Sequence, residues 1–97
     1  MRYYVDIDGT ICTNTNGEYT NAVAYIDRIE KINKLFNQGH QIIYWTARGS
    51  NTGKDWTTLT KDQLHRWGAK YTELIMRKPS YDVWIDDKAI NSEVFFK

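Results

Sequence analysis

The sequence has few residues that can crosslink the chain or hold a soft metal ion. Its 97 residues include one cysteine, Cys12, and two histidines, His40 and His65. A single cysteine cannot form a disulfide within the chain, and such sparing cysteine use is typical of proteins in a reducing cytoplasm. A structural zinc site is not expected either, because it takes four Cys or His ligands.

Long apolar runs and an excess of one charge are also missing. No stretch approaches the roughly 20 apolar residues of a membrane helix, and acidic Asp6 comes too early for a signal peptide. Lys and Arg number 13 and Asp and Glu number 12, which gives a formal net charge of +1. This balance gives no strong electrostatic case for nucleic acid or a membrane surface as the main partner. We therefore expect a cytoplasmic protein whose main partner is neither a membrane nor a nucleic acid.

The composition is that of a small folded domain. Hydrophobic residues make up 41% of the chain and aromatic residues 14%, which is enough for a packed core. Pro79 is the only proline, and there is no repeat or low-complexity linker. The length suits one domain, which we expect to span residues 1–97.

Short apolar runs alternate with longer amphipathic segments, a pattern that predicts an α/β fold. We expect strands at residues 3–7, 41–46, 74–76 and 81–86, and a short helix or strand within residues 89–97. Apolar residues recurring every three or four positions predict a helix from Asn21 to about Gln38. A second helix ends at Gly68, and the capping-box spacing of Thr60 and Gln63 places the start of its regular part at Thr60.

The polar stretch 13–20 contains Asn16-Gly17, a dipeptide that favours a tight hairpin turn. It predicts a short β-flap after the first strand. The order of elements predicts a parallel sheet with helices on its faces, and such sheets bind ligands at the carboxyl ends of their strands.

Polar side chains stand at or just beyond each of these predicted strand ends. Asp6 and Asp8 lie two residues apart in an extended segment and point to the same side. In chain order, the groups at the strand ends are Asp6 and Asp8, then Thr46 and Arg48, then Lys78, then Asp86 and Asp87. Four carboxylates in one crevice repel one another and remain ionised only beside cations. Lys78 supplies one positive charge. The remaining negative charge calls for a divalent cation, and hard oxygen ligands select Mg²⁺. The chemistry indicated is phosphoryl transfer.

Four segments in this order resemble the signature motifs of the haloacid dehalogenase superfamily of phosphatases. They are Tyr3–Thr10, Trp45–Arg48, Lys78-Pro79 and Trp84–Asp87. The resemblance spans nearly the whole chain. It implies a compact Rossmann-like core, Mg²⁺ dependence and an aspartyl-phosphate intermediate.

The resemblance also implies a role for each matching residue. Asp6 would be the nucleophile and Asp8 the general acid/base. Thr46 would bind the phosphoryl group, and Lys78 would offset its charge. The metal would be held by Asp6, the backbone carbonyl of Asp8, Asp86 and Asp87, the last directly or through water. For Arg48 two interpretations stay open: it holds a second anionic group of the substrate, or it binds a backbone carbonyl in its loop.

Superfamily members of this kind usually carry a cap domain inserted between two of the motifs. Here neither gap has room for one, which predicts a small capless member. Such members accept large substrates or close their site with another subunit, so a homo-oligomer is one expectation. The segment from Gly49 to Lys78 also resembles small phosphatases of bacterial surface-polysaccharide synthesis, which makes a sugar phosphate a candidate substrate.

The leading hypothesis is a Mg²⁺-dependent phosphomonoesterase of a small phosphorylated metabolite. A phosphatase of nucleotides or nucleic-acid ends is an alternative, because an open site admits a strand. A receiver-like module, phosphorylated on Asp for signalling, is a non-enzyme alternative. The order of the acids, with Asp6 and Asp8 at the first strand and Asp86-Asp87 at the last, favours the phosphatase, because receivers carry their paired acids at the first strand and the phosphorylated Asp at a middle one. The presence of Asp8 favours it further, because a receiver has no need of an acid/base there.

Overall fold

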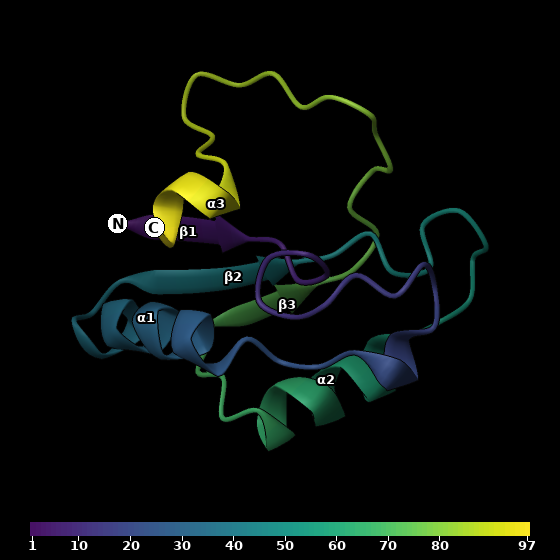
Figure 1. Ribbon diagram of the computed structural model, residues 1–97, viewed down its shortest axis with the longest axis horizontal. Coiled ribbons are helices and arrows are strands. Elements are labelled where there is room, and N and C mark those ends of the chain that lie inside the picture. Colours follow the sequence, from purple (N-terminus) through teal and green to yellow (C-terminus); the bar gives the residue numbers. More distant parts are fainter.

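A three-stranded parallel sheet forms the centre of the computed structural model, which describes residues 1–97. The strands are β1 (Arg2–Val5), β2 (Gln41–Trp45) and β3 (Glu73–Ile75), in the spatial order β1-β2-β3 (Figure 1). The helices are the 3-10 helix η1 (Tyr19–Asn21), α1 (Ile26–Asn37), α2 (Thr57–Arg66) and α3 (Ser92–Phe95). None of them has the length and apolar character needed to span a bilayer. The predicted α/β class with a parallel sheet is confirmed.

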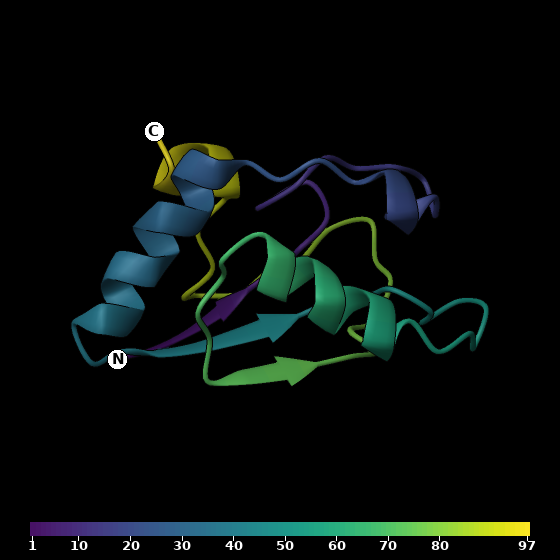
Figure 2. The same cartoon turned by 90° about the horizontal axis from the view of Figure 1, so that it is seen from below.

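The core lies between the sheet and the two longer helices. The connections from β1 to β2 and from β2 to β3 run in the same direction across the sheet. Because connections between parallel strands are right-handed, α1 and α2 lie on the same face of the sheet (Figure 2). The fully or nearly buried cluster there contains Val5, Ile7, Ile11, Cys12, Ile29, Ile32, Ile42, Tyr44 and Leu64. Burying one such side chain contributes about 1.5–3 kcal/mol. This packing fixes the strand ends relative to one another.

Helix α1 begins later than the sequence pattern predicts. Asn21 does not cap it but ends η1, and the helix starts at Ile26. The intervening residues are extended because their backbone pairs with the chain after β1: Thr13 N donates to Val23 O at 2.9 Å and Tyr25 N to Ile11 O at 2.8 Å. The predicted start was therefore wrong, whereas the predicted end is correct to within one residue.

Helix α2 begins earlier than predicted. Its first residue is Thr57, whose amide donates to Asp55 Oδ1 at 2.9 Å. The Asp55 side chain thus satisfies one of the free amides at the N-terminus of the helix. Thr60 and Gln63 lie in the interior of the helix and are buried. The capping-box interpretation of these two residues was wrong, and their side chains are free for other contacts.

The predicted fourth strand does not form. Residues 76–91 have no helix or strand, and Ile85 is 93% exposed. Figure 1 shows this segment as a long arch from the end of β3 to α3. Local contacts replace sheet pairing: the rings of Tyr81 and Trp84 lie 5.1 and 5.6 Å from the Lys78 ammonium, and Pro79 has no amide hydrogen to donate. As a result, β1 remains an edge strand.

The predicted flap keeps its turn but has little regular pairing. Asn16 and Gly17 both have positive φ, 53° and 95°, as a tight turn through Asn-Gly requires. Strand-like pairing is limited to two isolated bridges, a parallel one between Asp8 and Cys12 and an antiparallel one between Cys12 and Ala24. Only this flap, η1 and α1 separate the first two motifs, and only a loop and α2 separate the second from the third. No cap domain is inserted among them.

Candidate active site

A cleft of about 680 Å³ opens at the carboxyl ends of the strands. Five of the residues singled out from the sequence line it: Asp6, Asp8, Thr46, Arg48 and Lys78. The flap and the loop after β2 form its other walls, with Tyr19, Lys54 and Trp56 among the lining residues. The strands bring these groups together because parallel strands end at the same edge of the sheet.

Asp6 lies directly after β1 beside one hydroxyl and one cation. Thr10 Oγ1 donates to Asp6 Oδ2 at 3.5 Å, and Lys78 Nζ lies 3.9 Å from Asp6 Oδ1. Burial raises the pKa of Asp6 above its usual value, and the positive charge of Lys78 opposes this shift. A partly desolvated carboxylate next to an ammonium group is well suited to act as a nucleophile toward an anionic phosphate ester.

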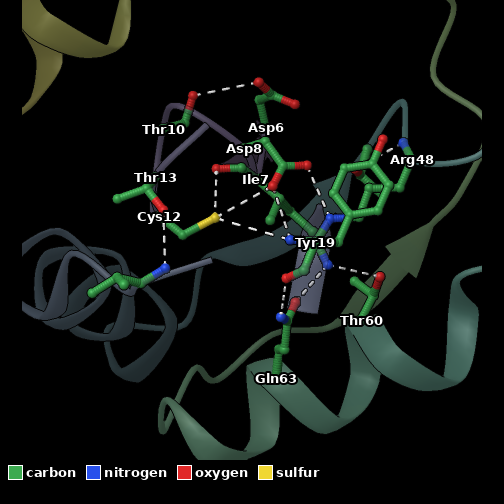
Figure 3. Close-up of polar contacts among 12 residues, drawn as sticks. Asp6, Ile7, Asp8, Thr10, Cys12, Thr13, Tyr19, Arg48, Thr60 and Gln63 are labelled. Atoms are coloured by element: carbon green, nitrogen blue, oxygen red, sulfur yellow. Dashed lines mark hydrogen bonds and ion pairs between the residues drawn. The ribbon is translucent and has the colours of Figure 1, made fainter. Parts of the chain in front are cut away.

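Asp8 forms a two-pronged ion pair with Arg48 (Figure 3). Arg48 Nε donates to Asp8 Oδ2 and Nη2 donates to Asp8 Oδ1, each at 2.9 Å. The Arg48 side chain has no exposed surface, whereas that of Asp8 is 17% exposed. The Asp8 carboxylate therefore faces the cleft on one side and a buried guanidinium on the other.

Thr46 and Lys78 are joined through the backbone. Lys78 N donates to Thr46 O at 2.8 Å, and Ser50 Oγ donates to Lys78 O at 2.7 Å. Thr46 Oγ1 accepts from Arg48 N at 3.2 Å, which leaves its own hydroxyl hydrogen to donate. A hydroxyl donor and an ammonium group thus stand together at the cleft where Asp6 lies, an arrangement that suits a phosphoryl group.

Asp86 and Asp87 do not join these residues. Both lie exposed in the arch of residues 76–91, and Asp86 Oδ1 accepts from Lys88 N at 2.9 Å. No group of three or more His, Cys, Asp or Glu side chains is placed to hold a metal ion. Three of the four expected segments therefore meet at the cleft, and the fourth does not.

The sequence interpretation missed two residues of this site, Thr60 and Gln63. Arg48 Nη1 donates to Thr60 Oγ1 at 3.1 Å and also to Gln63 Oε1. Both residues come from α2, one turn apart on the same face. Their three-residue spacing is the available signal in the sequence, and it also matches a capping box.

Comparisons with known proteins agree with this fold. No protein-family model matches the chain. A curated protein named phosphoglycolate phosphatase, from Nitrosopumilus maritimus, is 39% identical over 51 residues. The match covers 53% of this chain, and the chain spans only about a fifth of that protein.

A crystal structure of a protein from Vibrio cholerae superimposes with a TM-score of 0.86 at 26% sequence identity. The match covers 98% of this chain and 86% of the other. The ordered motifs, the parallel sheet with its polar strand ends and these two similarities support the resemblance of the chain to the haloacid dehalogenase superfamily.

Proposed function

We propose that this cleft hydrolyses phosphate monoesters through a covalent phosphoryl group on Asp6. The observation that carries the proposal is the meeting of Asp6, Asp8, Thr46 and Lys78 at one cleft. These groups supply a nucleophile, a second carboxyl group and two donors for phosphoryl oxygens. The name of the Nitrosopumilus relative, a phosphatase, supports the same reaction class.

The reaction has two steps. In the first, an Asp6 carboxylate oxygen attacks phosphorus, the bond to the ester oxygen breaks, and protonated Asp8 gives its proton to that oxygen. In the second, Asp8 takes a proton from water, and the resulting hydroxide displaces Asp6 and releases inorganic phosphate. Thr46 donates to a phosphoryl oxygen, and the ammonium of Lys78 offsets its charge.

Mg²⁺ is the cofactor that we propose from the superfamily resemblance. The carboxylates do not form a ligand set for it in their present positions, because Asp86 and Asp87 lie in the exposed arch. Asp86 and Asp87 would have to reach the cleft beside Asp6 to complete such a set. The two steps above use only groups of the chain.

The cleft lining favours a small polar substrate. Asn14, Asn16, Asn51 and Thr52 supply amide and hydroxyl groups, and the rings of Tyr19 and Trp56 meet edge to face at 5.0 Å. Amides and aromatic rings together suit the hydroxyl groups and apolar faces of a sugar. We therefore propose a small phosphorylated metabolite, with a sugar phosphate as the first candidate.

The test compares Asp6→Asn and Asp8→Asn on alkyl phosphates and on nitrophenyl phosphate, with Mg²⁺ and with excess chelator. Asp6→Asn removes the nucleophile, so activity should disappear on every ester. Asp8→Asn should lose about 10²–10⁴-fold on an alkyl phosphate, whose leaving group needs a proton. On nitrophenyl phosphate it should give a burst of nitrophenol and then slow turnover, since the second step lacks its base.

Asp62→Asn is the matched control, because Asp62 is an exposed carboxylate on α2. It should retain wild-type activity. A wild-type protein that turns over no ester in a panel of phosphorylated metabolites would contradict the proposed function. So would mass spectrometry that finds the trapped phosphoryl group on Asp86 or Asp87.

A further inference from the structure

Arg48 is a fully buried cation that the proposed reaction steps do not use. It is 2% exposed, although it lies only two residues after Thr46 at the cleft. A buried guanidinium is costly unless its hydrogens are paired. The contacts that pair them therefore indicate what the residue does.

All five N–H groups of Arg48 have an acceptor within the protein. Nε and one Nη2 hydrogen bind the two oxygens of Asp8. The Nη1 hydrogens bind Thr60 Oγ1 and Gln63 Oε1, and the remaining Nη2 hydrogen points to Cys12 Sγ at 4.0 Å. A second anionic group of a substrate would have to displace one of these acceptors. The geometry therefore favours a role for Arg48 within the protein.

On one side, Arg48 determines how Asp8 can lie. A planar guanidinium that binds both carboxylate oxygens fixes the rotation of the carboxyl group as well as its position. The pair joins residues 40 positions apart in the sequence, at the ends of β1 and β2. The exposed part of Asp8 is thereby held toward the cleft.

On the other side, Arg48 is itself held by α2 and the flap. Thr60 and Gln63 accept hydrogen bonds from Nη1 of the guanidinium, and the centre of the Tyr19 ring lies 4.7 Å from its central carbon. Gln63 Nε2 also donates to Tyr19 O at 2.6 Å. Figure 3 shows this chain of contacts from α2 through Arg48 to Asp8.

We propose that Arg48 is a positioning residue for Asp8, and that Thr60 and Gln63 position Arg48 in turn. This inference rests on the proposed function, in which Asp8 is the general acid/base. Arg48 keeps the Asp8 carboxyl group aimed at the leaving oxygen, where a displacement of about 1 Å costs on the order of 10²-fold in rate.

The first test is Arg48→Lys, which keeps a positive charge but loses the two-pronged contact. We expect kcat on alkyl phosphates to fall about 10–10²-fold, with a clearly smaller loss in the nitrophenol burst and little change in KM. Arg66→Lys is the matched control, because Arg66 is an exposed arginine on α2. It should behave as the wild type.

A second pair of variants guards against misfolding of Arg48→Lys. Thr60→Val removes one acceptor of Arg48 with little change of shape, and Thr60→Ser restores the hydroxyl. Thr60→Val should show the same leaving-group dependence as Arg48→Lys but with a smaller loss, and Thr60→Ser should recover most of the activity.

Two results would overturn the inference while leaving the proposed function intact. One is an Arg48→Lys variant that loses activity equally on alkyl and nitrophenyl phosphates, while Asp8→Asn loses more activity on alkyl phosphates. The other is a raised KM with unchanged kcat for substrates with a second anionic group, which would place Arg48 against the substrate.

A measurement without substrate tests the pairing itself. In a double-mutant cycle of Arg48→Met and Asp8→Asn, urea unfolding should show at least fivefold coupling between the two changes in the unfolding equilibrium constant. Additive effects would overturn the inference whatever the enzyme acts on.

Discussion

Gly49 occupies a position where the structure leaves no space for a side chain. It follows Arg48 directly and has a φ of +81°. A Cβ atom added there would lie 2.1 Å from the backbone oxygen of Lys54 and 3.3 Å from Trp56 Cδ1. The turn is also closed by a hydrogen bond from Gly53 N to Gly49 O at 2.8 Å. The movement of one side chain therefore cannot relieve the clash that Gly49→Ala creates.

Gly53→Ala is a matched control in the same loop. Gly53 has a φ of +74°, but an added Cβ would meet nothing within 4 Å. A left-handed conformation costs an alanine about 1–2 kcal/mol, and the smaller freedom of the unfolded chain offsets about 0.4–1 kcal/mol. Gly53→Ala should therefore lower the free energy of unfolding by only about 1 kcal/mol.

Gly49→Ala carries the same conformational cost and must also separate two backbone segments. Overpacking of this kind typically costs about 1–3 kcal/mol more, so the total loss should be about 2–4 kcal/mol. The displaced backbone adjoins Arg48, and the cleft walls Lys54 and Trp56 would move with it. Turnover should fall more in Gly49→Ala than in Gly53→Ala.

The measurement is urea unfolding of both variants, followed by tryptophan fluorescence and analysed with m-values. For a slope of about 1–3 kcal/mol per molar urea, the transition midpoint of Gly49→Ala should fall well below that of Gly53→Ala. Equal midpoints for the two variants would refute the reasoning, because the close approach to Lys54 O is the feature that separates them.

The remaining predictions concern two titratable groups at the site. Cys12 is fully buried, and burial raises its pKa to about 12, so at pH 8 a thiol reagent should label the native protein only after it unfolds. Rapid labelling of the folded protein would contradict this. Because the folded pKa of Asp6 is raised mainly by burial, the contribution of Asp6 to the free energy of unfolding falls as pH rises from 3.8 through that pKa. Asp6→Asn should thus be more stable than the wild type at pH 7, and this advantage should shrink toward pH 4 in denaturation curves. An Asp6→Asn variant less stable at pH 7 would mean that the Lys78 and Thr10 contacts outweigh the desolvation cost.

The sequence alone determined the parallel sheet and three of the segments at its carboxyl edge. Apolar runs located the three strands that form, and Asp6, Asp8, Thr46 and Lys78 stand beside their ends in the sequence. Parallel strands end at one edge, so the order of these residues was enough to predict that they meet at the cleft. Helix starts were less certain, because backbone pairing beside Ile11 and Thr13 overrode the helical pattern of residues 22–25.

Only the tertiary structure decided which partners the polar side chains take. Nothing near Arg48 in the sequence reveals that its guanidinium binds Asp8, or that Thr60 and Gln63 turn inward to hold it. Likewise, the apolar pattern of residues 81–86 reads as a strand, yet its aromatic rings gather around Lys78 and leave Asp86 and Asp87 exposed. The reason is that periodicity records how a segment meets its own neighbours, whereas a buried charge takes whichever partners the packing of distant elements places within reach.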